Sequence, residues 1–339
     1  MSPILGIESS CDETAAAIVS EHGIVLAETL LSQSEHAAFG GVVPEIAARA
    51  HLARLPGLVA IVMTEAGLKF KSLGGVAASS GPGLIGGLIV GSGVAKGIAL
   101  AAGLPFVAVN HLEAHALTAR LTDGVAFPYL LLLVSGGHCQ CVAVEGVGRY
   151  RRLGGTIDDA VGEAFDKVGK LLGLGWPGGP ALERLAAGGD PARHAFPRPL
   201  RGRAGCDFSF SGLKTAVAQV VATYPPGALP AQDAADIAAS FQQAVAEVMA
   251  DRVAHALVMM PETRRLVVAG GVAANTLLRR TLQGVADAHR VTLTAPPLRL
   301  CTDNAVMVAW AGVERLRLGL ADPLTTAPRP RWPLEALRP

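Results

Sequence analysis

Two histidines four residues apart offer the clearest chemistry in this sequence. They fall in the stretch Asn110-His-Leu-Glu-Ala-His115. If this stretch is helical, the imidazoles of His111 and His115 leave one face about one turn apart, as a shared metal ion requires. The chain has only nine histidines among 339 residues, so this spacing favours a metal site over two unrelated side chains.

The order of these residues argues against a zinc protease, which carries His-Glu-x-x-His. Here Glu113 lies two positions from either histidine, so a helix would point it away from the metal-binding face and the general base would be missing. Two histidines are also too few ligands for a metal. The candidate third ligand is Asp303, expected in the first turn of a helix that runs to about residue 318.

Composition sets the class of protein. A chain of 339 residues suits one large or two medium domains with a substantial core. Half of the residues are hydrophobic and 40 are glycine, which indicates a globular α/β enzyme with many tight turns. The net charge of +1 gives no overall basic field, so RNA contact requires a local patch or a partner. Five cysteines without a repeated C-x-x-C motif indicate reduced thiols in a cytosolic protein.

Neither a secretory signal nor a membrane span is expected. The N-terminus enters a strand directly, without a basic region or a cleavage site. Residues 74–109 carry Lys96 as their only charge, but glycines interrupt the stretch repeatedly. We therefore expect a buried strand, a glycine turn and a packed helix there.

Two segments are predicted to form hairpins with functional turns. Residues 4–19 read as strand, polar turn and strand; Ser9, Ser10 and backbone N–H groups could donate to a phosphate. Asp12 and Glu13 could hold a metal-bound water or a substrate amine, although an ordinary surface hairpin is an equal alternative. Residues 129–144 repeat the design, with the turn Ser135-Gly-Gly-His138 between apolar strands. A third strand, in residues 266–275, ends in a Gly-Gly turn that opens a helix. These units suggest two similar α/β halves around a nucleotide cleft.

Other segments give weaker signals. Residues 156–173 predict an amphipathic helix, in which neighbouring glycines favour Asp166 facing a ligand. Residues 193–203 carry four arginines and predict a mobile basic loop, either an RNA contact or a solvated surface. The tail after Pro323 is rich in proline and arginine and is expected to be loosely ordered.

Together these segments resemble the universal tRNA threonylcarbamoyladenosine synthase family, whose bacterial transferase subunit is called TsaD. The likeness runs from Gly6-Ile-Glu-Ser-Ser-Cys-Asp-Glu-Thr14 to Cys301-Thr-Asp-Asn-Ala305. Further motifs in the same order begin at Pro44, Gly81, Asn110, Val134, Asp158, Asp207 and Gly270. The resemblance implies the duplicated actin, Hsp70 and sugar-kinase (ASKHA) fold, α/β in class. It assigns residues 1–127 and 300–322 to the first half and 128–299 to the second, with 323–339 as the tail.

The resemblance also implies an activity. Family members transfer a threonylcarbamoyl group from threonylcarbamoyl-AMP to N6 of the adenosine next to the anticodon, in tRNAs that read A-starting codons. The implied metal ligands are His111, His115 and Asp303, which would hold one divalent ion per subunit, iron ahead of zinc. The implied catalytic residues are Asp12, Glu13 and His138. Substrate binding is implied for Val134, Ser135, Gly136, Gly137, His138, Asp166, Gly179, Glu183 and Asn275. ATP and ADP are candidate ligands as well.

The implied partners are tRNA, a paralogous TsaB-like subunit, a TsaE-like ATPase and a TsaC-like enzyme that makes the donor, all in the cytoplasm and none in a membrane. The chain has Ala114 where the family commonly has Gly, and Ser79 and Cys139 where it commonly has Thr. None of these departures removes an implied ligand. A small-metabolite kinase or a nucleotide-gated scaffold of the same superfamily is the alternative, but neither needs paired histidine ligands.

Overall fold

The computed structural model describes residues 2–39, 41–175, 177–225, 227 and 229–338. The chain forms two compact units. The first comprises Met1–Ala126, Glu145–Tyr150 and Thr302–Pro339, and the second comprises Phe127–Val144 and Arg151–Cys301. The division inferred from the sequence differs at residues 127, 300 and 301, which belong to the second unit, and at residues 145–150 and the tail, which belong to the first.

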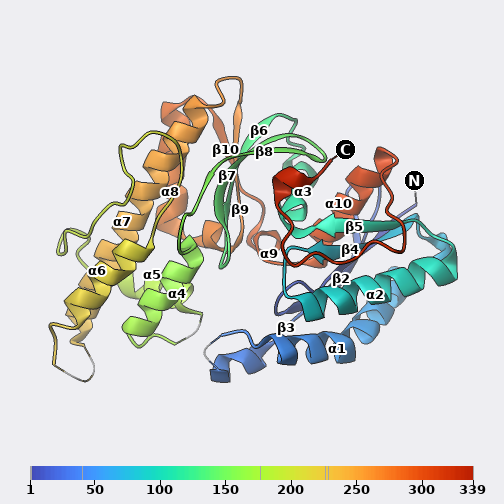
Figure 1. Ribbon diagram of the computed structural model, residues 1–339, viewed down its shortest axis with the longest axis horizontal. Coiled ribbons are helices and arrows are strands. Elements are labelled where there is room, and N and C mark those ends of the chain that lie inside the picture. Colours follow the sequence, from blue (N-terminus) through green and yellow to red (C-terminus); the bar gives the residue numbers. More distant parts are fainter. Residues whose placement is uncertain (1, 40, 176, 226, 228, 339) are drawn as a thin grey trace. The chain divides into compact units, whose positions relative to one another are not determined.

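The first unit is built on a five-stranded sheet in the order β3-β2-β1-β4-β5. Central strand β1 pairs antiparallel with β2 and parallel with β4, and all its residues are buried. Helices α1 and α2 cover one face of this sheet, and α3 and α10 cover the other (Figure 1). The strands are β1 Ile4–Glu8, β2 Glu13–Val19, β3 Val25–Ser32, β4 Gly75–Gly81 and β5 Phe106–Asn110; the helices are α1 Pro44–Glu65, α2 Ile85–Ala102, α3 His111–Asp123 and α10 Ala305–Arg317.

The second unit repeats this topology with its own five strands, in the order β10-β9-β6-β7-β8. Central strand β6 pairs antiparallel with β7 and parallel with β9, as β1 does with β2 and β4. The prediction of two similar α/β halves is therefore confirmed at the level of the sheets. The strands are β6 Tyr129–Val134, β7 Cys139–Gly146, β8 Arg149–Gly155, β9 Arg265–Ala269 and β10 Thr292–Thr294.

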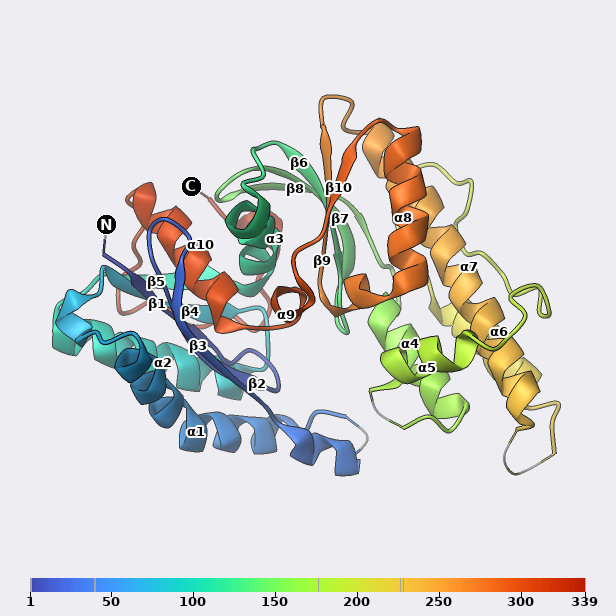
Figure 2. The ribbon, with the colours of Figure 1, turned by 180° about the vertical axis from the view of Figure 1, so that it is seen from behind.

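The helices of the second unit gather beside its sheet, and α7 and α8 run side by side (Figures 1 and 2). They are α4 Val161–Leu171, α5 Gly178–Ala186, α6 Ser211–Val221, α7 Ala231–Val258, α8 Thr276–Ala288 and α9 Leu298–Cys301. Short 3-10 helices span Ser34–Phe39, Phe70–Ser72, Gly271–Ala274 and Leu334–Ala336.

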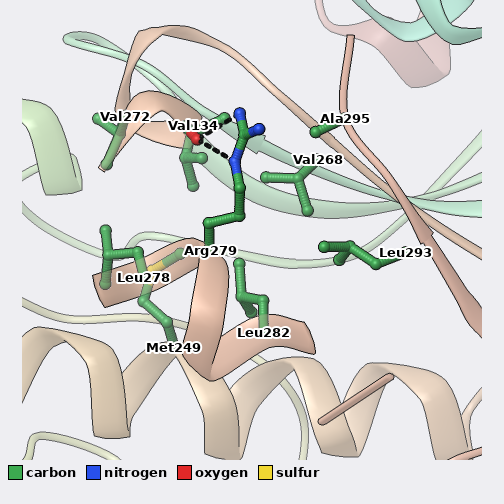
Figure 3. Close-up of a pocket in the computed structure, with 10 residues that line it drawn as sticks. Val134, Met249, Val268, Val272, Leu278, Arg279, Leu282, Leu293 and Ala295 are labelled. Carbon is green, nitrogen blue, oxygen red and sulfur yellow. Dashed lines mark hydrogen bonds between the residues drawn. The ribbon is translucent and has the colours of Figure 1, made fainter. Parts of the chain in front are cut away.

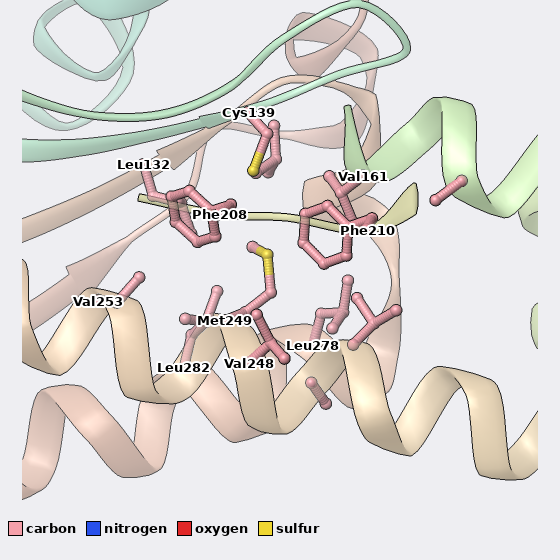
Figure 4. Close-up of a cluster of buried hydrophobic side chains, with 14 of the residues drawn as sticks. Leu132, Cys139, Val161, Phe208, Phe210, Val248, Met249, Val253, Leu278 and Leu282 are labelled. Carbon is pink, nitrogen blue, oxygen red and sulfur yellow. The ribbon is translucent and has the colours of Figure 1, made fainter. Parts of the chain in front are cut away.

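Apolar side chains hold α7 and α8 against the second sheet. Val134 at the end of β6 lines an apolar pocket with Leu278 and Leu282, and the guanidinium of Arg279 bonds the carbonyl of Ala273 beside it (Figure 3). Deeper in the same core, the stacked rings of Phe208 and Phe210 pack above Met249 of α7 (Figure 4).

A glycine in β1 decides how closely α10 approaches the first sheet. A Cβ on Gly6 would lie 2.4 Å from the nitrogen of Ala309 and 2.5 Å from the carbonyl oxygen of Ala305. Only glycine permits this direct packing of the helix on the strand. The start of α10, with Asp303 just ahead of it, therefore lies close to β1.

The tail differs from the loosely ordered segment that the sequence predicted. Trp332, Leu334 and Leu337 are buried within the first unit. The backbone N–H of Arg329 donates to the carbonyl of Ser80 at 2.7 Å. Three apolar side chains and backbone pairing therefore anchor the tail despite its proline and arginine content. Pro339 lies outside the described residues.

Helices α1 and α2 are long and apolar enough to cross a membrane by length and composition alone. In the structure they pack on each other and on the first sheet. Lys96, in the middle of α2, donates to the carbonyl of Thr326 and lies 5.4 Å from the ring centre of Phe106. The strand, turn and packed helix predicted for residues 74–109 are what this part of the chain forms.

Candidate functional site

The helix that carries the histidine pair begins where the sequence provides a cap. The side-chain oxygen of Asn110 accepts hydrogen bonds from the backbone of Leu112 at 2.9 Å and Glu113 at 3.3 Å. Its amide group donates to the carbonyl of Trp332 at 3.0 Å, so the tail also fixes this cap. Helix α3 therefore starts at His111, and the helical geometry expected for the pair is confirmed.

The two imidazoles converge on one carboxylate oxygen. Nε2 of His111 lies 3.3 Å from Oδ1 of Asp303, and Nε2 of His115 lies 3.1 Å from the same oxygen. Ligands bound at about 2.0–2.1 Å around one metal ion lie roughly 3.0–3.4 Å apart. The separations of the oxygen from the two nitrogens therefore fit a metal site. Asp303 precedes α10 rather than lying in its first turn, because Asn304 is the residue that caps this helix.

The electrostatics of this cluster favour a cation. Burial lowers the pKa of His111, but the charges of Asp303 and Glu8 outweigh this and raise it well above the usual value. Burial likewise raises the pKa of Asp303, but His111 holds it well below the usual value. The side chain of Asp303 remains 24% exposed, so the cluster keeps an open side, as catalytic metal sites do.

Sequence reasoning missed Glu8, which lies against this cluster. Its carboxylate is fully buried, and Oε2 lies 3.1 Å from Nδ1 of His111. Oε2 also accepts the hydroxyl of Ser79, and Oε1 accepts the backbone N–H of Ser10 at 2.6 Å. Burial raises the pKa of Glu8, but the charge and hydrogen bond of His111 bring it below the usual value. His111 and Ser79 are 103 and 71 residues away, so no local pattern could reveal these contacts.

Glu113 points away from the histidine face, as predicted. Its buried carboxylate accepts hydrogen bonds from the backbone of Gly148 at 3.1 Å and the hydroxyl of Tyr150 at 2.9 Å. It also pairs with Arg315 at 3.2 Å. Glu113 is thus a structural ion partner of α10, which agrees with the lack of a protease base.

The acidic turn between β1 and β2 is held by a buried histidine. His51 of α1 lies 3.0 Å from the carbonyl of Cys11 and 2.8 Å from the hydroxyl of Thr14, so it bridges the residues on either side of Asp12 and Glu13. Burial and the charges of Asp303 and Asp12 raise the pKa of Glu13 to about 9, so Glu13 carries a proton at neutral pH.

The two serines expected to donate to a phosphate are already engaged. The hydroxyl of Ser9 donates to the carbonyl of Gly87 at 2.9 Å, and the hydroxyl of Ser10 lies 3.2 Å from Nδ1 of His111. Both serines are buried. The prediction is therefore wrong for Ser9, because its hydroxyl already donates to Gly87 of α2 and cannot also donate to a phosphate.

By contrast, the turn between β6 and β7 exposes its backbone to solvent. The N–H of Ser135 donates to the carbonyl of His138 at 2.8 Å, and the N–H of His138 donates to the hydroxyl of Ser135 at 3.2 Å. Gly136 and Gly137 are exposed, and a Cβ on either would meet nothing within 4 Å. Val134 lies against Gly270, where φ is +95° and a Cβ would come 2.3 Å from the Val134 oxygen.

The remaining predicted binding residues lie at helix starts in the second unit. Asp166 accepts the backbone N–H of Gly178 at 2.8 Å, which brings it to the start of α5 next to Gly179. Burial raises the pKa of Asp166 above the usual value, although hydrogen bonds from the backbone of Gly178 and Gly179 lower it. Glu183 of α5 accepts the N–H of Thr276 at 2.7 Å, and Asn275 caps α8 through Leu278 at 3.0 Å. Each of these three side chains therefore accepts a backbone N–H at the start of a helix, α5 for Asp166 and α8 for Glu183 and Asn275.

The arginine-rich segment is anchored rather than mobile. Arg198 forms a two-pronged ion pair with Glu247 of α7 at 3.1 and 3.2 Å, and Arg201 pairs with the same carboxylate at 2.8 Å. Buried Arg252 donates to the carbonyls of Arg203 and Gly205. Glu247 partly neutralises two of the four arginines, which weakens the RNA-contact hypothesis for this segment.

Sequence comparison decides the family. The family described as tRNA N6-adenosine threonylcarbamoyltransferase, TsaD, matches residues 24–310. A protein of that name from Granulibacter bethesdensis is 67% identical over 98% of this chain and 94% of its own length. Another from Paramagnetospirillum magneticum is 63% identical over 98% of this chain and 97% of its own length. The chain belongs to the tRNA N6-adenosine threonylcarbamoyltransferase family. It is an enzyme, a transferase, and the resemblance drawn from the motifs is confirmed.

Solved structures show the fold of this TsaD family member. HypF from T. kodakarensis matches with a TM-score of 0.64 at 15% identity, over 93% of this chain and 48% of HypF. The activator of the 2-hydroxyisocaproyl-CoA dehydratase from Clostridium difficile matches with a TM-score of 0.53 at 12% identity, over 94% and 96%. At these identities the likeness concerns the fold alone, and the predicted ASKHA fold class is confirmed.

Proposed function

We propose that this chain transfers the threonylcarbamoyl group from threonylcarbamoyl-AMP to N6 of the adenosine next to the anticodon, in tRNAs that read A-starting codons. The observation that carries the proposal is the convergence of His111, His115 and Asp303 in a member of the TsaD family. The alternatives, a small-metabolite kinase and a nucleotide-gated scaffold, require no such cluster and are not favoured by relatives named as transferases.

We assign one divalent ion per subunit to His111, His115 and Asp303, iron ahead of zinc. Two imidazoles and one carboxylate suit either ion and leave coordination positions open. When bound, such an ion would act as a Lewis acid on the carbamoyl oxygen of the donor. The two histidines and the aspartate would hold the ion in place, because α3 and the start of α10 are both packed on the first sheet.

We assign the proton transfers to the acidic turn. The N6 amine attacks the carbamoyl carbon, the new C–N bond forms, and the C–O bond to AMP breaks while the amine loses a proton. Asp12 and Glu13 are adjacent carboxyl groups, and in the metal-free chain the pKa of Glu13 is raised to about 9. A carboxyl group of this turn would take up the proton that the amine loses, and His51 keeps the turn in position.

We assign donor binding to the second unit. The exposed backbone of Gly136 and Gly137, beside the start of α4, suits the phosphate of an adenylate, and Ser135 shapes this turn through its backbone bond to His138. The remaining residues given this role are Val134, His138, Asp166, Gly179, Glu183 and Asn275, with His138 also catalytic. ATP or ADP would use the same adenylate-binding groups.

We infer that the chain works with tRNA as substrate and with a paralogous TsaB-like subunit, a TsaE-like ATPase and a TsaC-like donor-making enzyme, in the cytoplasm. The net charge of +1 supports weak tRNA binding by this chain alone. Helices α1 and α2 expose large apolar side chains, which supports a protein partner there: Leu52, Ile61, Ile85, Ile89 and Leu100. The free cysteines support a reducing compartment.

The test is transfer from threonylcarbamoyl-AMP to an A-decoding tRNA, measured by nucleoside mass spectrometry with the bacterial partner proteins present. Wild type should form modified adenosine, and His115→Ala should form little. His289→Ala is the matched control, because this histidine lies at the far end of α8 and should leave the reaction unchanged. Equal product from wild type and His115→Ala would retain the activity and reject the metal's role. No product from wild type, with donor and partners shown to be active, would reject the proposed function.

A further inference from the structure

We propose that Glu8 is the positioning residue of the metal centre, a buried carboxylate that fixes the ring of His111 so that its Nε2 faces Asp303. This inference rests on the metal centre proposed above. It adds a residue that does not itself reach the ion and that lies 103 positions from the histidine it orients.

The ring of His111 is held at both nitrogens. Nδ1 lies 3.1 Å from Oε2 of Glu8 and 3.2 Å from the hydroxyl of Ser10, and Nε2 lies 3.3 Å from Oδ1 of Asp303. An ionised carboxylate only accepts hydrogen bonds, so in the ion-bound form Nδ1 must carry the proton and Nε2 must offer its lone pair. Such a carboxylate behind a ligating histidine fixes both tautomer and ring orientation. Nδ1 of His115 is buried without a hydrogen-bond partner among the described residues, so this support is given to one ligand of the pair.

Glu8 can perform this role because it is itself immobilised. The hydroxyl of Ser79 on β4 donates to one carboxylate oxygen, and the backbone N–H of Ser10 donates to the other. The side chain is fully buried at the end of β1. A buried carboxylate with donors on both oxygens has one orientation, and it transmits this orientation to the imidazole.

The charges of the metal centre also support a role for Glu8 there. Glu8 and Asp303 supply two negative charges, and two neutral imidazoles supply none. A divalent ion neutralises both carboxylates in a site where unbalanced charge is costly. Glutamine at position 8 would keep the shape but offer one acceptor oxygen in place of two, to Ser10, Ser79 and His111 together, and it would remove half of this negative charge.

The test compares Glu8→Gln with Glu113→Gln in the full-length chain. Both residues are fully buried carboxylates near the histidine pair, but Glu113 pairs with Arg315 and does not contact an imidazole. Zinc affinity is measured by competition with a chromophoric chelator, and the coordination is followed by the visible absorption of the cobalt-substituted protein. We expect Glu8→Gln to weaken zinc binding by about 10- to 100-fold and to change the cobalt spectrum. We expect Glu113→Gln to lower the melting temperature without changing zinc affinity.

Circular dichroism checks the fold of each variant. If Glu8→Gln does not fold, Glu8→Asp serves instead, because it keeps the charge but draws the carboxylate away from Nδ1 and should also weaken zinc binding. A folded Glu8 variant with the zinc affinity and cobalt spectrum of wild type would overturn the positioning role and leave the metal centre intact. Equal losses in Glu8→Gln and Glu113→Gln would also overturn it, since any buried carboxylate would then have the same effect. A wild-type chain that binds no zinc or cobalt would overturn the metal centre and this inference with it.

Discussion

The turns that follow β1 and β6 occupy the same place in two sheets whose strand orders match when one is read in reverse. The contacts that hold these two turns differ. The β1–β2 turn is closed by side chains, with Ser9 bonded to α2 and His51 bridging Cys11 and Thr14. The β6–β7 turn is closed by its own backbone and exposes Gly136 and Gly137.

This difference supports the roles proposed above for the two turns. The first turn fixes carboxylates and histidines, which suits chemistry that depends on exact side-chain placement. The second turn offers bare backbone, which suits a phosphate or an adenylate that needs N–H donors at close range. The fold places one turn at the end of each central strand, and the residues of each turn determine its role.

The largest effect that does not depend on pH should come from crowding the closed turn. In Gly87→Ala the new Cβ would lie 2.2 Å from the backbone oxygen of Ser9, so α2 must move away from the turn. Overpacking against backbone costs roughly 3 kcal/mol, and the gain in helix propensity offsets about 1 kcal/mol of it. We expect a net loss of about 2 kcal/mol in the free energy of unfolding, measured by urea denaturation.

Gly97→Ala is the matched control on the same helix, because a Cβ there would meet nothing within 4 Å. It should be neutral or stabilising by up to about 1 kcal/mol. Equal destabilisation by the two substitutions would show that the turn is not tightly packed.

A pH-dependent effect should follow from the raised pKa of Glu13, about 9 in the folded chain against 4.5 for an ordinary glutamate. Between these values the folded state holds a proton that the unfolded state has lost. This contribution to stability is therefore complete below pH 4.5 and is lost as the pH rises to about 9. In metal-free protein, Glu13→Gln should gain stability relative to wild type over this range, measured by thermal melts at several pH values. A difference that does not vary with pH would contradict the raised pKa.

The smallest change in stability should come from the open turn. Gly137→Ala adds a Cβ with no atom within 4 Å, so the free energy of unfolding should change by less than about 0.5 kcal/mol. If donor binding uses this backbone, the same substitution should raise KM for threonylcarbamoyl-AMP. Unchanged KM together with unchanged stability would make the turn an ordinary surface turn.

Much of the fold was readable because it depends on local patterns. Apolar runs separated by a polar turn in one case and a glycine turn in the other predicted the two hairpins, and the i, i+4 histidines predicted the face of α3. The tail was predicted wrongly because its order depends on where Trp332 and Leu334 find a buried surface. The arginine segment was predicted wrongly for a similar reason, since Glu247 and Arg252 on α7 anchor it.

The candidate site was only partly readable. Spacing alone gave His111 and His115, whereas Asp303, 188 residues beyond His115, was only a candidate third ligand until the family resemblance supported it. Glu8 was visible only as the first acid of a polar turn, and its contact with His111 depends on the register of β1 beside β4. Local chemistry can therefore be read from the chain, whereas partners brought together by the sheet cannot.

X-ray absorption of the purified protein tests the metal centre of the first unit most directly. We predict one iron or zinc ion per chain with nitrogen and oxygen ligands at about 2.0–2.2 Å, and loss of this ion or altered coordination in Asp303→Ala. Wild type and Asp303→Ala that hold the same ion with the same coordination, or wild type that holds none after loading with either metal, would contradict it.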